Sequence, residues 1–361
     1  MKSFRALLAS LLAGVAVALT GAYCDGSGRT QDAASPALPS VFERKMPPLD
    51  GATGWINSPP LTVGALRGKV VLVDFWTYTC INWMRTAPWL RTWADKYKDA
   101  GLVVIGVHSP EFAFEQDPAR VKHFTAAMDL RYPVAIDSRH AIWQAFDNQY
   151  WPALYIVDAQ GRIRHTQFGE TDYDKAEAVF RQLLKDNGAQ DLPPITPSIG
   201  QGQEAAADWT NLKTPETYAG AARTERFASP GGVVGLKRNV YTAPERLHEN
   251  QWALIGDWTM EREAARSNAG NARVQFRFHA RDVHAVMGSA MEGEGPVRIR
   301  VTIDGKPPGA AHGTDIDADG AGIVSEFRMY QLIRQSPPIE DRTVEILFFD
   351  RGVELFAFTF G

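Results

Sequence analysis

Cysteine is nearly absent from this chain of 361 residues, which contains only Cys24 and Cys80. Cys24 lies beside an N-terminal apolar segment, so the folded part has a single thiol, and a scaffold held together by disulfides is excluded. No apolar run long enough to span a membrane follows residue 23. The formal net charge is only −4, and the chain therefore lacks the broad cationic surface that nucleic-acid binding requires. Cys80 is either a reactive thiol or a small buried apolar side chain.

The N-terminus has the pattern of an export signal. Lys2 and Arg5 precede an apolar stretch over residues 6–22, which predicts a signal peptide at 1–22. Residues 23–41 are rich in Gly, Ser, Ala and Pro and predict a flexible tether. We therefore expect a periplasmic or secreted protein. Two alternatives are an uncleaved N-terminal anchor and a lipid on Cys24, although Tyr23 is bulkier than lipoprotein signals prefer at that position.

The remaining length allows two domains with cores of their own. Residues 42–189 predict an α/β domain, and residues 190–213, with several Pro and Gly, predict a linker. Within the first domain, the apolar runs predict strands at 70–75, 102–107, 153–157 and 163–168. The amphipathic segments predict helices at 81–98, 118–128, 139–146 and 174–186.

From 214 to 361 the hydrophobic period changes to two, which predicts an all-β antiparallel sandwich of the jelly-roll kind. Residues 274–279 and 297–303 alternate, and 344–349 with 353–360 predict a terminal hairpin. The segment 315–326 satisfies the calcium-loop pattern D-x-D-x-D-G-x5-E, although no helix can enter it at the glycines before it. It is therefore a weak metal candidate against the alternative of a polar hairpin loop, with these possible ligands: Asp315, Asp317, Asp319 and Glu326.

Aromatic residues are plentiful in this second domain. Most should fill the core of a sandwich, and a platform for a sugar is the alternative. They are Trp252, Trp258, Phe276, Phe278, Phe348, Phe349, Phe356, Phe358 and Phe360.

Cys80 follows a buried apolar strand and begins a predicted helix, in the string VVLVDFWTYTCINW at 70–83. The helix N-terminus favours the thiolate, which predicts a Cys80 pKa below the free-thiol value of about 8.5. Asp74 stands six residues before Cys80, where thioredoxin-like proteins keep a buried acid. Pro88 stands where they kink the same helix, and Trp151 and Pro152 match their cis-proline loop. Together these features predict a thioredoxin-like domain.

A narrower likeness covers both domains, from residue 42 to the last residue. The strings DFWTYTCIN (74–82), GVHSPEF (106–112), YWPA (150–153), FHARDVH (278–284) and YQLIRQ (330–335) resemble the periplasmic part of DipZ-type cytochrome c biogenesis proteins. The resemblance implies a TlpA/ResA-like thioredoxin domain followed by a sandwich similar to a carbohydrate-binding module.

What the resemblance implies for function is thiol–disulfide exchange without a cofactor. The implied partners are exported protein thiols or disulfides, a small thiol or membrane electron donor, and a glycan. Members of this family usually carry C-I-N-C and an integral-membrane electron-donor domain. This chain lacks that membrane domain, and Trp83 replaces the second cysteine.

One thiol can attack a disulfide but cannot release the mixed disulfide by itself. Trp83 begins a helical series of apolar residues and should fill the place of the resolving thiol as part of the core. Asp74 then needs another partner, either Cys80 through water or the Trp83 N–H. His108 and Glu111 follow the strand that should run parallel to 70–75 and are expected on the face of Cys80. The alternative for His108 is a loop residue satisfied by backbone.

The sequence therefore predicts Cys80, Asp74, Pro152 and His108 as catalytic residues. Three functions remain open: a single-thiol oxidoreductase, a redox-inactive protein that binds a protein or glycan, and a one-cysteine peroxidase. The last reading rests on Thr77-x-x-Cys80, with Val73 where peroxidases of that kind place a proline. We also expect the sandwich to dock onto the first domain through Trp209 and the segment 218–227.

Overall fold

The computed structural model describes residues 44–195, 197–289 and 295–361. The predicted signal peptide, tether and lipidation site lie outside these residues. Among the residues described, no helix is long and apolar enough to cross a membrane. Residues 43–361 form one compact unit.

The first part of the chain forms a six-stranded sheet with strand order β1-β4-β3-β2-β5-β6. Strands β2, β3 and β4 are parallel, and β1, β5 and β6 run antiparallel to their neighbours. The bounds are β1 Gly54–Ile56, β2 Val70–Trp76, β3 Leu102–His108, β4 Val134–Ile136, β5 Ala153–Val157 and β6 Ile163–Phe168. The four predicted strands are thus confirmed to within one residue, while the short β1 and β4 escaped prediction.

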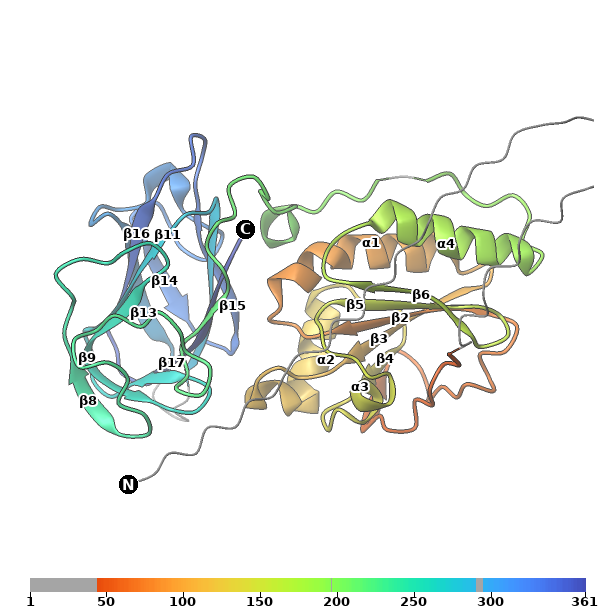
Figure 1. Cartoon of the computed structure of the whole chain (residues 1–361), viewed down its shortest axis with the longest axis horizontal. Helices are drawn as coiled ribbons and strands as arrows, with labels where there is room; N and C mark the ends of the chain where they lie inside the picture. The colour runs from red at the N-terminus through yellow and green to blue at the C-terminus, as the bar shows by residue number, and fades with distance from the viewer. Residues whose placement is uncertain (1–43, 196, 290–294) are drawn as a thin grey trace, which may run out of the picture. The chain divides into compact units, whose positions relative to one another are not determined.

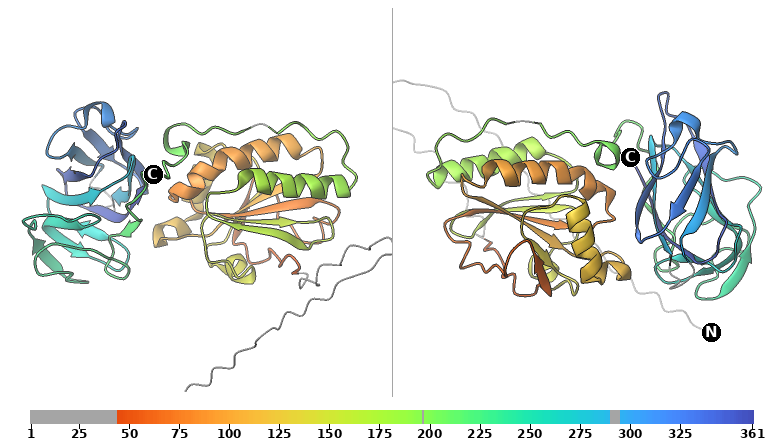
Figure 2. Two further views of the ribbon diagram at one scale, coloured as in Figure 1. Left: turned by 45° about the horizontal axis from the view of Figure 1, so that its top comes forward. Right: turned by 180° about the vertical axis from the view of Figure 1, so that it is seen from behind.

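Helices cover both faces of this sheet. They are α1 Ile81–Tyr97, α2 Pro118–Ala127, α3 Ala141–Ala145 and α4 Tyr173–Asp186, with the short 3-10 helix η1 at Ala113–Gln116. Figure 1 and Figure 2 show α1 and α4 side by side on one face, and Figure 1 shows α3 on the other. Successive side chains of β2 point to opposite faces of the sheet, which explains this arrangement. Val70 and Leu72 belong to the hydrophobic core beneath α1 and α4, and Val71 and Val73 to the core beneath α3.

Local signals explain where the helices begin. Asp117 caps α2 by accepting a hydrogen bond from the Ala119 N–H at 2.8 Å, and Pro118 occupies the first helical position. On α1, the predicted apolar series is confirmed: Trp83, Ala87, Leu90 and Tyr97 are buried, and Ala94 is partly buried.

The second part of the chain is all β, with eleven strands in the order β14-β13-β16-β11-β9-β10-β17-β12-β15, while β7 pairs with β17 and β8 with β9. Their bounds are β7 Thr217–Tyr218, β8 Arg238–Tyr241, β9 Trp252–Met260, β10 Ala265–Ser267, β11 Ala272–Phe278, β12 Asp282–Ser289, β13 Val297–Ile303, β14 Ala321–Val324, β15 Arg328–Arg334, β16 Arg342–Phe348 and β17 Val353–Phe360. Two further 3-10 turns are η2 Gly202–Glu204 and η3 Gly309–Ala311.

One bent strand joins the two layers of this sandwich. Trp252 to Ile255 of β9 pair with β11, and the residues after Gly256 pair with β8 and β10. Gly256 lies at the bend with φ +97°, a conformation that a side chain would strain. Across the core, Phe276 of β11 meets Phe358 of β17 with ring centroids 5.1 Å apart.

The predicted terminal hairpin is wrong. β16 pairs with β11 and β13, whereas β17 pairs with β12, β10 and β7. The short connection therefore carries the chain from one layer to the other. A tight turn between alternating strands has the same local sequence whether the strands pair or separate, so the partners were decided by the packing of the whole sandwich.

The outer face of the second part packs against the first part. Phe356 of β17 contacts the rings of Phe112 and Phe114 at 5.2 and 4.7 Å between centroids, and Phe327 contacts Phe114 at 5.0 Å. This confirms the expected docking. Trp209, expected to take part, is instead 61% exposed.

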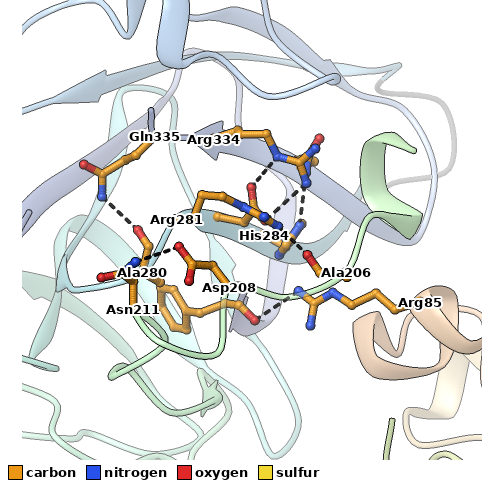
Figure 3. A network of polar contacts seen from close by, with 12 residues as sticks. Arg85, Ala206, Asp208, Asn211, Ala280, Arg281, His284, Arg334 and Gln335 are labelled. Carbon is orange, nitrogen blue, oxygen red and sulfur yellow. Dashed lines mark hydrogen bonds and ion pairs between the residues drawn. The ribbon is translucent and has the colours of Figure 1, made fainter. Parts of the chain in front are cut away.

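Polar contacts reinforce this junction, as Figure 3 shows. Arg85 of α1 pairs with Glu170 at 2.8 Å and donates to the carbonyl of Phe360 at 3.3 Å. Arg281 and Arg334, which both pair with Asp282, also donate to carbonyls of the segment between the two parts. That segment is tied to α1 as well, because both terminal nitrogens of Arg91 lie 2.7 Å from Glu204.

Candidate active site

Cys80 stands at the junction of β2 and α1, as the N-cap of the helix. The preceding turn closes through a hydrogen bond from the Cys80 N–H to the Thr77 carbonyl at 3.2 Å. Thr79 donates to the buried Glu115 at 2.6 Å, and Glu115 also accepts the backbone N–H groups of Glu111 and Phe112. Glu115 therefore fixes the Cys80 turn against the loop after β3. No local sequence signal identified it.

The sulfur of Cys80 faces the Trp151–Pro152 loop. The sulfur lies 3.9 Å from the Trp151 carbonyl oxygen, and the Trp151–Pro152 peptide is cis, as the sequence predicted. The indole N–H of Trp151 donates to the Ser109 carbonyl at 3.0 Å. The structure thus brings Cys80 and Pro152 together from distant parts of the chain.

The predicted low pKa of Cys80 is wrong. Burial raises the pKa of this thiol well above its ordinary value, and the carboxylates of Glu216 and Glu111 raise it further. Backbone N–H groups of Trp83 and Asn82 act in the opposite direction but do not prevail. The helix N-terminus was visible in the sequence, whereas the two opposing carboxylates come from other segments.

Trp83 lies in the core of the first part of the chain, as the sequence predicted. Its side chain is fully buried and stacks on Trp76 with ring centroids 4.3 Å apart. Its indole N–H donates to Oδ2 of Asp74 at 2.8 Å, which is one of the two alternatives expected for that acid. Burial raises the pKa of Asp74 to about 8, although the hydrogen bond from Trp83 opposes the shift. Asp74 is therefore mostly protonated at neutral pH.

His108 and Glu111 end in different places. The ring of His108 is fully buried, stacked on Tyr78 at 5.5 Å and edge-on to Trp76 at 4.9 Å. Burial lowers the pKa of His108 to about 3, so the imidazole is neutral. Glu111, in contrast, reaches the cavity beside Cys80.

That cavity has a volume of about 360 Å³. One wall comes from the first part of the chain, with Cys80, Glu111 and Trp151. The other comes from the connecting segment, with Trp209, and from the second part, with Glu216 and Phe360 among others. Tyr218 connects the two walls, because its hydroxyl lies 2.7 Å from Glu111 and 3.1 Å from Glu216. Trp209 and Tyr218 belong to the segments expected at the docking surface, whereas no local sequence signal identified Glu216.

The calcium-like loop has its carboxylates engaged elsewhere. Asp315 pairs with Arg328 at 2.7 Å, and Asp317 accepts backbone N–H groups of its own loop. Glu326 pairs with Arg328 and His123. Across residues 44–195, 197–289 and 295–361, no three acidic, His or Cys side chains gather as a metal site.

Eight of the nine aromatic residues singled out in the second part lie inside the protein, whereas Phe349 is partly buried beneath Arg298 and Arg300. In the core of the sandwich are Trp252, Trp258, Phe276, Phe278, Phe348, Phe358 and Phe360. Phe356 packs at the junction with the first part, as described above. These buried rings leave no aromatic platform for a sugar on the faces they occupy.

Comparison with known proteins agrees with this architecture. Residues 49–166 match the AhpC/TSA family, and residues 214–361 match the family described as thioredoxin like C-terminal domain. Protein DipZ of Mycobacterium tuberculosis is 39% identical over 323 residues, which cover 87% of this chain and 42% of DipZ. The chain therefore spans less than half the length of that relative.

Two shorter proteins match the first part of the chain. Thiol-disulfide oxidoreductase YkuV of Bacillus subtilis is 33% identical over 143 residues, 40% of this chain and 96% of YkuV. The solution structure of a thioredoxin-like protein in the oxidized form is 34% identical, covers 40% of this chain and 97% of its own, and has a TM-score of 0.37.

Proposed function

Because the chain belongs to the thioredoxin-like thiol–disulfide oxidoreductase family, we propose that it exchanges disulfides of exported proteins through Cys80 alone. The observation that carries this proposal is the contrast within the first turn of α1. Cys80 lines an open cavity, while Trp83, three residues later, is sealed in the core. The predicted signal peptide at 1–22 supports a location outside the cytoplasm.

The chemistry runs in two steps. The Cys80 thiolate attacks one sulfur of a disulfide, so that a Cys80–sulfur bond forms, the old disulfide bond breaks, and the departing thiolate takes a proton from solvent. A second thiolate, from a small molecule or a partner protein, then attacks the substrate sulfur of the mixed disulfide, forms a new disulfide with it, and releases Cys80, which takes a proton from solvent. No net oxidation of the protein occurs over the cycle.

The raised pKa of Cys80 sets the pace of the first step. Only the thiolate is nucleophilic, and burial with the two nearby carboxylates keeps its population small at neutral pH. The rate of attack should therefore increase with pH up to and beyond pH 8. Asp74 accepts a hydrogen bond from the Trp83 N–H. In this proposal it stabilises the Cys80 turn and does not assist a second thiol.

The test uses the purified protein with Cys24→Ser, so that Cys80 is the only thiol. Incubation with bis(2-hydroxyethyl) disulfide should give a Cys80 mixed disulfide, detected by intact mass, and an added small thiol should reverse it. The Cys80→Ser variant is the control. Insulin reduction should require added thiol at every turnover.

Two outcomes would reject this function. A thiol that reacts only after unfolding would favour a redox-inactive binding protein. Faster turnover with hydrogen peroxide than with any disulfide would instead assign a one-cysteine peroxidase.

A further inference from the structure

The cavity beside Cys80 combines two carboxylates with two indole rings. Glu111 and Glu216 line it together with Trp151 and Trp209. Trp209 is 61% exposed and so keeps much of its surface available to a bound molecule. Carboxylates and the faces of aromatic rings are the two kinds of group that attract an ammonium or guanidinium ion.

The negative charge of this pair is only partly compensated. Arg223 pairs with Glu111 at 3.0 Å and lies over the ring of Tyr218 at 3.6 Å. Tyr218 is near both carboxylates but has a single hydroxyl hydrogen, so it donates to only one of them at a time. When it donates to Glu111, no other donor to Glu216 is found in the part of the chain that the structure describes.

The electrostatic environment of the Cys80 sulfur is consistent with a negative charge that is only partly compensated. Both carboxylates oppose ionisation of Cys80, in addition to the effect of burial. Burial and the Glu111 carboxylate also raise the pKa of Glu216 to about 7, as expected for two acids that share one donor. Lys213 lines the same cavity and, like Glu216, is exposed to solvent, so the charges of both residues are partly screened.

We propose that the cavity selects disulfides that carry a cationic group close to the reacting sulfur. This inference rests on the proposed function of Cys80. A bound cation would lie between Glu216 and the indoles, would neutralise the carboxylates, and would thereby favour the Cys80 thiolate at the moment of attack. In a polypeptide substrate the cation would be a Lys or Arg side chain near the substrate cysteine.

Three small disulfides test the proposal directly with the Cys24→Ser protein. Cystamine and bis(2-hydroxyethyl) disulfide have nearly the same size and differ in carrying ammonium or hydroxyl groups, and dithiodipropionate carries carboxylates. Rates of mixed-disulfide formation are divided by the rates for 2-mercaptoethanol, a thiol without a further charged group, which corrects for the reactivity of each disulfide. Cystamine should be favoured over the neutral disulfide by roughly five- to tenfold, and the anionic one should be slowest.

Glu216→Gln should reduce this preference to about twofold or less, while the Gln side chain keeps its size. The matched control is Glu225→Gln, because the Glu225 side chain is 74% exposed and pairs only loosely with its neighbour Arg226, at 3.8 Å. High ionic strength should also weaken the preference of the unmodified protein.

Each failure has its own meaning. If no disulfide reacts with folded protein, the proposed function fails and this inference with it. Equal corrected rates for all three disulfides would overturn the inference alone. A preference for the anionic disulfide would also overturn it and would assign the dominant charge to Lys213.

Discussion

Two buried aspartates of this protein have the same exposure and opposite acidity. Asp74 and Asp282 are both 0% exposed. Burial raises the pKa of Asp74 to about 8, because its one hydrogen-bond donor is the neutral indole N–H of Trp83. Burial acts on Asp282 in the same direction, but hydrogen bonds from Arg334 and Arg281 outweigh it and lower that pKa. The partner, and not the depth, decides the charge of a buried carboxyl group.

The protonation state of each aspartate matches its position in the fold. Asp282 begins β12 and joins the strands to the segment that leads from the first part of the chain. Asp74 on β2 is bound to Trp83 on α1, on either side of the turn that carries Cys80. A neutral acid bound to an indole holds that turn in place without a buried charge.

The largest change should follow Trp83→Cys, which removes the donor to Asp74 and the ring stacked on Trp76. The cavity should cost about 3–5 kcal/mol of unfolding free energy. If the variant folds, the new thiol should resolve mixed disulfides, so that insulin is reduced by the protein once the dithiol is regenerated. Trp83→Ser is the matched control, because it leaves a similar cavity without a thiol. A folded Trp83→Cys protein whose activity equals that of Trp83→Ser would contradict this expectation.

Asp282→Asn should cost about 3 kcal/mol at pH 7, because it leaves two arginines at the junction without their counter-charge. Chemical denaturation measures the loss. Asp257→Asn serves as the control, since Arg238, the arginine paired with Asp257, is 68% exposed and such pairs contribute about 1 kcal/mol or less. Equal effects of the two substitutions would contradict a special role for the buried network.

Asp74→Asn should change the pH dependence of stability. Between the unfolded pKa of 3.8 and the folded pKa of about 8, the native state keeps a proton that the unfolded chain has released. Stability should therefore fall as pH rises through this window, by up to about 1.4 kcal/mol per pH unit, and level off above pH 8. Asn carries no such proton, so the stability of the variant relative to the unmodified protein should increase as pH rises. Parallel pH profiles of the two proteins would contradict the raised pKa.

The contribution of Asp282 to stability depends on pH in the opposite direction. Its lowered pKa stabilises the fold above pH 3.8, and this contribution is lost as pH falls toward the folded pKa. Relative to the unmodified protein, the Asp282 variant should lose stability as pH rises toward 3.8, whereas the Asp74 variant should gain stability between pH 3.8 and about 8.

The elements of the first part were predictable because their signals are local. The run from Val70 to Trp83 shows strand, turn and helix start in fourteen letters, and Asp117 with Pro118 marks the next helix. The cis peptide before Pro152 was expected from the same kind of pattern. In the second part the strands were visible as alternation, but the pairing of β16 and β17 was not.

Only part of the candidate site was predictable from the sequence. Cys80, Asp74 and the Pro152 loop were predicted as site residues from spacing, and the structure brings Cys80 and this loop together. The acidity of Cys80 was predicted in the wrong direction, because the prediction could count the helix N-terminus but not Glu216. That residue lies 136 positions away in the sequence and meets the thiol only because the two parts of the chain dock.

The sequence alone determined that Cys80 stands at the start of a helix and that Trp83 stands three residues later, where a C-x-x-C motif would have its second cysteine. Residue identity and hydrophobic periodicity are sufficient for this conclusion, because a residue type and its place on a strand or helix are local properties. Tertiary structure decided how this thiol behaves. Burial and the charges of distant carboxylates act through space, so the raised pKa of Cys80, the neutral Asp74 and the cavity with two acids arise only when the fold is complete.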